Sequence, residues 1–246
     1  ESFSSFSQLD TLCHSLFIQY KGKTLAELKE ILGIDASVKD IAAKCIIRMF
    51  GTDCKRLNQI SDFTKAGIIA KTITITPESG RTEDMKLKHI DFEEWADRDA
   101  DFEESDIYDY FCEHSFLCPI FCEHDSKDQS KTTFEGFKRF SFDEDFIENE
   151  VRRTWEDSRK LIHRNELEWE YLYDKQGNKR MNKSGSYIGA PNFPKSSEYK
   201  VFFRGGADVS TEKTRTECVN GIRMLPQYFW LKGSYIAKKL QEIPYI

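Results

Sequence analysis

The stretch Gly67-Ile68-Ile69-Ala70-Lys71-Thr72-Ile73-Thr74-Ile75 is rich in β-branched residues and is followed by the turn sequence Pro77-Glu78-Ser79-Gly80. A run of this kind between turn residues predicts a β-strand. The segment 85–90 then returns with alternating lysines and predicts a second strand. We expect these two strands to pair as a hairpin.

Helices and further strands are predicted on both sides of this hairpin. Apolar residues at helical spacing predict a helix over 8–20, and Thr24 with Glu27 forms a capping-box pattern that starts a second helix, ending near Gly33. The other expected elements are helices over 38–50, 146–163 and 229–240, strands over 115–121, 136–142 and 199–204, and a long exposed loop over 175–197. This order predicts a mixed α/β fold, a single domain over residues 1–246 with a central mixed sheet flanked by helices.

The composition favours a packed globular protein. The hydrophobic fraction is 39% and the aromatic fraction is 13%, and both values are typical of a chain that buries a core. No apolar run approaches the roughly 18 residues that a membrane span needs, and no secretory leader is recognised. Seven cysteines at irregular spacing are expected to be reduced thiols, which favours a cytoplasmic location and no membrane partner.

The tetrapeptide Phe-Cys-Glu-His occurs twice, at 111–114 and 121–124, with Cys118 between the two copies. Cysteines and histidines in this number could supply four ligands to zinc. The alternative is a buried strand from Leu117 to Phe121 that carries its cysteines as small apolar residues. The spacing matches no common zinc module, so we favour the strand and expect no metal in this domain.

Charge is distributed unevenly along the chain, although its net value is −6. Residues 91–113 hold eleven acidic side chains and one arginine, whereas residues 175–240 hold thirteen basic side chains and four acidic ones. Binding to phosphates needs one basic face and not a basic total. The C-terminal third is therefore the predicted place for a nucleic-acid interface, and a merely solvated surface is the alternative.

Four segments of the chain occur in an order that is typical of one family. They are Gly22-Lys23-Thr24-Leu25-Ala26-Glu27-Leu28, Asp62-Phe63 followed by 67–73, Trp155-Glu156-Asp157, and Leu225-Pro226-Gln227-Tyr228-Phe229-Trp230-Leu231-Lys232. Together they resemble the MutH family, which includes the nicking endonuclease of mismatch repair and GATC-cutting type II restriction enzymes. The resemblance spans nearly the whole chain and implies a restriction-endonuclease-like core.

The resemblance also implies that catalytic acids of the family are missing here. The family places an Asp before a strand, Glu-x-Lys on that strand and a Glu on the preceding helix, and such carboxylates hold Mg²⁺. Asp62 and Lys71 keep their places, but Ile69 and Ile47 stand where the two glutamates are expected. We therefore expect Asp62 and Lys71 to be vestigial, with no cofactor in this domain and no cleavage by it alone.

Two alternatives remain open. The first is an active Mg²⁺-dependent endonuclease that cuts at GATC with other acids, for which Asp53, Glu78 and Glu83 are the nearest candidates. The second is a regulatory protein-interaction module without DNA binding, which the acidic segment 91–113 favours. Steep loss of DNA affinity with rising salt is expected of a domain that grips phosphates and not of the interaction module.

Some restriction enzymes of the family resemble a fusion of two such domains, one that cuts and one that does not. The resemblance then implies a non-cleaving effector domain. Such a domain binds double-stranded DNA containing GATC and allosterically assists a separate catalytic domain, which holds the Mg²⁺. Because the first residue is Glu1 and not Met, we expect the chain to be a C-terminal fragment of a larger restriction enzyme.

The residues expected to bind DNA lie mostly in the basic C-terminal third. Arg204 resembles the arginine that opens the base-reading loop of the family, and Gly205 and Gly206 would let the backbone approach DNA closely. The family usually has Pro after that arginine, which this chain lacks. Trp230 takes the place of a tyrosine that senses adenine methylation, with a core position as the alternative, whereas Trp155 is assigned to the core. The further expected contacts are Lys39 and the phosphate contacts Lys183, Lys213, Arg215 and Lys232.

Overall fold

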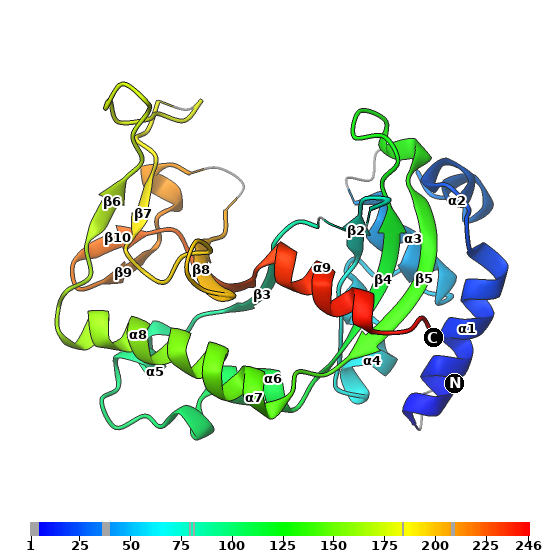
Figure 1. The fold of residues 1–246 in the computed structure, drawn as a ribbon, viewed down its shortest axis with the longest axis horizontal. Coiled ribbons are helices and arrows are strands. Elements are labelled where there is room, and N and C mark those ends of the chain that lie inside the picture. The colour runs from blue at the N-terminus through cyan, green and yellow to red at the C-terminus, as the bar shows by residue number, and fades with distance from the viewer. Residues whose placement is uncertain (1–4, 36–39, 79, 81, 184, 208–209) are drawn as a thin grey trace. The chain divides into compact units, whose positions relative to one another are not determined.

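The computed structural model describes residues 5–35, 40–78, 80, 82–183, 185–207 and 210–246, with only the backbone of Asp62. The chain forms two compact units (Figure 1). Unit 1 comprises residues 1–83, 113–142 and 233–246, and unit 2 comprises 84–112 and 143–232. Two such units are compatible with one domain or with two, so the single domain over 1–246 stays a prediction.

The sheet of unit 1 is built around β4 (Ser115–Cys122), which is buried along its whole length. On one side β1 (Ile68–Ala70) and β2 (Ile73–Ile75) run parallel to it one after the other, and on the other side β5 (Thr133–Phe140) runs antiparallel. The predicted strand over 67–75 is therefore confirmed, with a break at Lys71 and Thr72. The backbone N–H of Lys71 still donates to the Leu117 carbonyl, at 3.0 Å, so the break is local.

The predicted hairpin between 67–75 and 85–90 is wrong. Strand β2 pairs with β4 in unit 1, whereas β3 (Met85–His89) pairs antiparallel with β11 (Gln227–Leu231) in unit 2. The turn sequence between the two strands permits a reversal, but pairing is decided by which apolar faces can be buried together. Met85 and Leu87 of β3 are both buried.

Five α-helices of the described residues belong to unit 1. They are α1 (Phe6–Tyr20), α2 (Leu25–Ile31), α3 (Ile41–Met49), α4 (Ser61–Lys65) and α9 (Gly233–Glu242). The Thr24 hydroxyl accepts from the Glu27 N–H while the Glu27 carboxylate accepts from the Thr24 N–H, which confirms the predicted capping box. Helix α1 packs against β5, and α2 packs against α3.

The predicted helix over 229–240 is wrong in its first part. Residues Gln227, Phe229 and Leu231 are buried and alternate with the partly exposed Tyr228 and Trp230, which is the period of a strand. This alternation places them in β11, and helix α9 begins only at Gly233. Of the lysines that gave the segment the pattern of a basic helix, Lys232 follows the end of β11, whereas Lys238 and Lys239 lie on α9.

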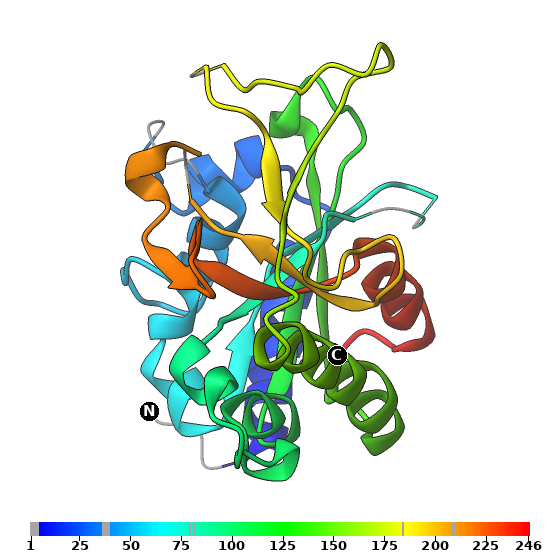
Figure 2. The ribbon, with the colours of Figure 1, turned by 90° about the vertical axis from the view of Figure 1, so that its left-hand side faces the viewer.

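The main sheet of unit 2 has the order β3-β11-β8, with β8 (Val201–Gly205) also antiparallel to β11 (Figure 2). Trp95 on α5 (Phe92–Ala96) is fully buried and lies 5.3 Å, between ring centroids, from both Phe203 and Phe229. Trp155 is 6% exposed and lies beside Trp95, so its assignment to the core is confirmed. The mixed α/β fold with a mixed sheet and flanking helices is confirmed as well.

The remaining elements of unit 2 are helical segments and two small hairpins. They are α6 (Asp106–Cys112), α7 (Glu144–Phe146), a π-helical turn (Ile147–Val151), α8 (Arg152–His163), and the strand pairs β6 (Trp169–Tyr171) with β7 (Gly189–Pro191) and β9 (Glu217–Val219) with β10 (Ile222–Met224). The predicted helix over 146–163 is confirmed as a continuous helical run. The predicted loop over 175–197 is wrong in part, since it contains β7 and two isolated bridges.

No described helix is long and apolar enough to pass through a membrane. The cytoplasmic location stays a prediction.

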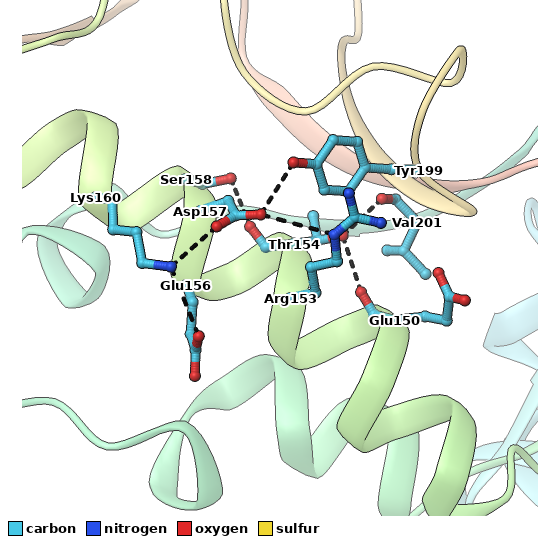
Figure 3. A network of polar contacts seen from close by, with 9 residues as sticks. All are labelled: Glu150, Arg153, Thr154, Glu156, Asp157, Ser158, Lys160, Tyr199 and Val201. Atoms are coloured by element: carbon cyan, nitrogen blue, oxygen red, sulfur yellow. Dashed lines mark hydrogen bonds and ion pairs between the residues drawn. The ribbon is translucent and has the colours of Figure 1, made fainter.

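Polar contacts tie α8 to the start of β8 (Figure 3). The buried Thr154 hydroxyl lies 2.7 Å from the Val201 carbonyl and donates to it across the two elements. One turn further along, Asp157 accepts from the Tyr199 hydroxyl at 3.0 Å and from Lys160 at 3.1 Å. These contacts hold the beginning of β8 against α8, and Arg204 lies further along the same strand.

Substituting Thr154→Val tests this tie, because valine keeps the shape and burial of the side chain but cannot donate. Removing a buried donor leaves the carbonyl with one partner fewer, so we expect the free energy of unfolding to fall by about 1–2 kcal/mol. Denaturant unfolding of the full chain measures it. Ser158→Ala is the matched control, since the Ser158 hydroxyl is equally buried but donates within the helix, to the Thr154 carbonyl. Equal losses in both variants would contradict the role of Thr154.

Candidate functional site

One face of the β3-β11-β8 sheet carries basic and aromatic side chains that are partly open to solvent. We call it the Arg204 face and define it by Lys86, Arg204, Tyr228 and Trp230. In the antiparallel register Arg204 lies opposite Tyr228, and Trp230 lies opposite both Phe202 and Lys86. Side chains that are directly opposite in a sheet point to the same side. The alternation along β11 thus separates this face from the aromatic core around Trp95.

The structure brings the two residues predicted as base readers together. The Arg204 guanidinium lies 4.9 Å from the ring centroid of Trp230 and 5.0 Å from that of Phe202, in cation–π geometry. The Trp230 indole N–H donates to the Arg204 carbonyl at 3.2 Å. Trp230 is partly exposed, so it is placed on a surface and not in the core.

Asp84 fixes the orientation of the guanidinium. Its carboxylate lies 2.6 Å from Arg204 Nη2, with the Arg204 side chain 45% exposed and that of Asp84 24% exposed. Arginine has five N–H donors in a planar fork, so one carboxylate contact leaves donors for a second planar acceptor. Asp84 therefore acts as a positioning residue for Arg204.

The glycines after Arg204 are required by close packing within the face. A Cβ at Gly206 would lie 2.5 Å from the Tyr228 ring and 2.6 Å from Lys86 Nζ, and one at Gly205 would lie 2.8 Å from the Leu225 side chain. Lys86 Nζ sits 3.4 Å from the Tyr228 ring centroid. A larger residue at 206 would thus displace both members of this cation–π pair.

Sequence reasoning missed Lys86, Tyr228 and Asp84. The alternating lysines of 85–90 were a usable signal, because a strand with one polar side and one buried side has this pattern. That signal was assigned to a hairpin with the 67–75 strand, and the face could not be assembled without the pairing of β3 with β11.

The other predicted DNA contacts are scattered. Lys232 directly follows β11 and is half-buried, with its N–H donating to the Lys200 carbonyl at 2.8 Å. Lys213 is exposed in the short turn before β9, and Lys183 is exposed in the segment between β6 and β7. Arg215 is engaged, since its side chain is only 13% exposed, pairs with Glu212 and stacks on Trp169. Lys39 lies outside the described residues.

The residues at the predicted vestigial catalytic positions belong to unit 1. Asp62 is on α4, but its side chain lies outside what the structure describes, and Lys71 is half-buried just after β1. Ile69 is half-buried on β1, and Ile47 on α3 is 1% exposed among apolar core residues. The side chain of Ile47 therefore contributes to packing at the place where the family resemblance puts a metal ligand.

The doubled tetrapeptide does not form a metal cluster in the described part of the chain. Cys118 and Cys122 are buried on β4, and burial raises the pKa of the Cys118 thiol to about 12. His124 instead lies 2.9 Å from the Thr133 hydroxyl. Among the described residues no three His, Cys, Asp or Glu side chains are placed to hold a metal ion together. The buried-strand interpretation of 117–121 is confirmed.

Comparison with known proteins agrees with the class that the fold suggests. The mixed sheet flanked by helices is compatible with a restriction-endonuclease-like core, and the chain is similar over nearly its whole length to a type II restriction enzyme. That relative is Sau3AI of Staphylococcus aureus, 23% identical over 263 aligned positions that cover 96% of this chain and 52% of the enzyme. The chain thus spans about half the length of this relative. No family model matches the chain.

A titratable cluster lies beside β3, apart from the Arg204 face. Glu94 on α5 accepts from the Asp106 N–H at 3.1 Å, and Asp106 in turn pairs with Lys88 at 2.6 Å. Burial, followed by the negative charge of Asp106, raises the pKa of Glu94 to about 7. At pH values between the ordinary pKa of a glutamate and this raised pKa, Glu94 is protonated in the folded state and ionised in the unfolded chain. The free energy of unfolding therefore falls as pH rises through that window.

Replacing Glu94 with Gln should remove this dependence. We expect Glu94→Gln to gain stability relative to the unmodified protein as pH rises from 5 to 8, because glutamine never becomes charged. Thermal unfolding at four pH values measures the difference. Glu93→Gln, an exposed position on the same helix, serves as control and should show no such trend. A difference for Glu94→Gln that does not vary with pH would contradict the assignment.

Proposed function

We propose that this chain is the DNA-binding effector domain of a type II restriction enzyme. It binds double-stranded DNA that contains GATC, does not cleave it alone, and assists a separate catalytic domain. Two findings support this proposal, the similarity to Sau3AI over 96% of the chain and the Arg204 face. The observation that carries it is the position of Arg204, held by Asp84 and Trp230 at the exposed end of a strand.

Arg204 has the chemistry to read guanine. A guanidinium can donate two parallel hydrogen bonds to guanine O6 and N7 in the major groove, which is the commonest specific contact between protein and DNA. Because Asp84 and the Trp230 ring already restrict the side chain, little conformational entropy remains to be lost on binding. Trp230, next to it, is the proposed contact to the neighbouring base pair.

Absence of cleavage follows from the two isoleucines. Mg²⁺ needs hard oxygen ligands, usually from more than one carboxylate, to activate water and neutralise charge on the phosphate. In our assignment Asp62 is the one acid left, since Ile47 and Ile69 replace the other two. Mg²⁺ is then held by the catalytic domain, and this domain needs no cofactor.

Assistance to a catalytic domain requires that DNA binding here changes the state of that partner. The chain spans about half of its relative, which leaves room for a second domain in a protein of that length. The proposed effector would then act within one enzyme, in the cytoplasm, on DNA that carries more than one site.

Fluorescence anisotropy with a GATC duplex and a scrambled duplex, each at two salt concentrations, tests the proposal. We expect tighter binding to GATC, affinity that falls steeply with salt, and no cutting of a GATC plasmid in Mg²⁺. Cutting would establish the active-endonuclease alternative. Failure to bind either duplex would refute DNA binding and leave the protein-interaction module.

Arg204→Ala should selectively weaken binding to GATC. Loss of a bidentate guanine contact costs about 1–3 kcal/mol, or roughly tenfold to a hundredfold in affinity, and leaves the scrambled duplex nearly unaffected. Arg98→Ala is the control, since Arg98 is an exposed arginine of the acidic segment that donates to the His163 carbonyl. An equal loss on both duplexes would show that Arg204 binds phosphate and does not read a base.

A further inference from the structure

Residues 172–183 and 185–188 form a small structured segment between β6 and β7, which we call the arm (Figure 1, yellow-green). Three backbone hydrogen bonds close a triangle within it. The Leu172 N–H donates to the Ile188 carbonyl at 2.9 Å, that of Ile188 to Arg180 at 2.8 Å, and that of Arg180 to Leu172 at 2.8 Å. Each of the three chain segments is thus held by the other two, so the arm keeps its shape without a core of its own.

Two similar loops project from this triangle. Their sequences are Asp174-Lys175-Gln176-Gly177-Asn178 and Asn182-Lys183-Ser184-Gly185-Ser186. In the first, the Asp174 carboxylate accepts the N–H groups of residues 176 and 178, and in the second the Asn182 side chain accepts that of Ser186. A glycine with positive φ closes each loop. Each loop therefore presents one lysine, Lys175 or Lys183, at the same position.

The arm is strongly basic for its size. It carries the exposed cations Lys175, Lys179, Arg180 and Lys183 against a single acid, Asp174. The charge of Asp174 is used within its own loop, where backbone hydrogen bonds hold its pKa below the usual range. Within the described part of the chain, Lys175, Arg180 and Lys183 form no ion pair. The arm is thus a local concentration of positive charge, although the net charge of the whole chain is −6.

Large apolar side chains are exposed beside these cations. Five of the nine exposed large hydrophobic residues among the described ones belong to the arm or its base, namely Tyr171, Leu172, Tyr173, Met181 and Tyr187. Lys179 Nζ lies 3.7 Å from the Tyr171 ring centroid. Clustered exposed apolar surface marks an interaction site. Here the exposed apolar side chains lie beside cations that form no ion pair among the described residues. This combination suits a nucleic acid, because its phosphates attract lysines and its sugars and groove edges can contact aromatic rings.

The arm is also tied to another predicted DNA contact. The Asn182 side-chain amide donates to the Ser210 carbonyl at 2.8 Å. Ser210 leads directly into the turn that carries the exposed Lys213, and Arg215 in the same segment stacks on Trp169 of β6 at 4.5 Å. The arm and the segment 210–215 therefore form one basic surface of unit 2.

We infer that the arm binds the sugar-phosphate backbone of duplex DNA beside the recognition site, through Lys175 and Lys183 of its twin loops. This inference rests on the proposed function. Contacts to phosphate position the protein without specifying sequence. The arm therefore contributes affinity for any duplex, whereas the Arg204 face contributes the preference for one sequence.

The double variant Lys175→Gln with Lys183→Gln tests the inference in the full chain. Both lysines are exposed loop residues, so the fold is expected to be unchanged. We expect affinity for GATC and scrambled duplexes to fall equally, by about threefold to tenfold at moderate salt. The slope of log K against log salt should decrease by about 1.8, or about 0.9 for each phosphate contact.

Lys55→Gln with Lys127→Gln is the matched control, since both lysines are exposed, neither forms an ion pair in the described part of the chain, and the change in net charge is the same. A loss on GATC alone would overturn the backbone role. Unchanged binding to both duplexes would overturn the inference and leave the proposed function intact. If the unmodified protein binds neither duplex, the proposed function itself fails, and the inference fails with it.

Discussion

The packing of β11 between β3 and β8 is the constraint on which the rest of unit 2 depends. Phe229 and its neighbours Gln227 and Leu231 are buried, and Phe229 lies against Trp95. In a strand the residues between them must point the other way. Burial of one apolar set thus places Tyr228 and Trp230 on the opposite side, where the flanking strands add Lys86 and Arg204. A shift of one residue in the register of β11 would turn its buried side chains to the Arg204 face and bury Tyr228 and Trp230, so the Arg204 face would not form.

Unit 1 contains the positions at which the family resemblance predicts catalytic acids. The strand that resembles a nuclease strand is present and pairs in parallel with a fully buried β4. The helix residue Ile47 is buried among apolar residues and Ile69 of the strand is half-buried, and neither presents a carboxylate. A charged group in the place of Ile47 would be costly to bury without a bound metal.

Sequence patterns predicted the elements whose signals are local. The Thr24–Glu27 capping box, the buried strand 115–121 and the helical run 146–163 depend on residues a few positions apart. Predictions failed where partners are distant in sequence. Nothing near 85–90 indicates that β3 pairs with β11, so the hairpin was wrong and Lys86 and Asp84 were missed. Arg204 and Trp230 were predicted individually through the resemblance, but their contact depends on strand register, which only the fold supplies.

Amide hydrogen exchange of the full chain, free and saturated with a GATC duplex, tests the central claim most directly. The claim is that the Arg204 face is the surface that meets DNA. It predicts slower exchange on DNA binding in residues 202–206 and 226–230, and a smaller effect there with a scrambled duplex at equal occupancy. Bound DNA that leaves these segments unchanged, with protection confined to unit 1, would contradict it.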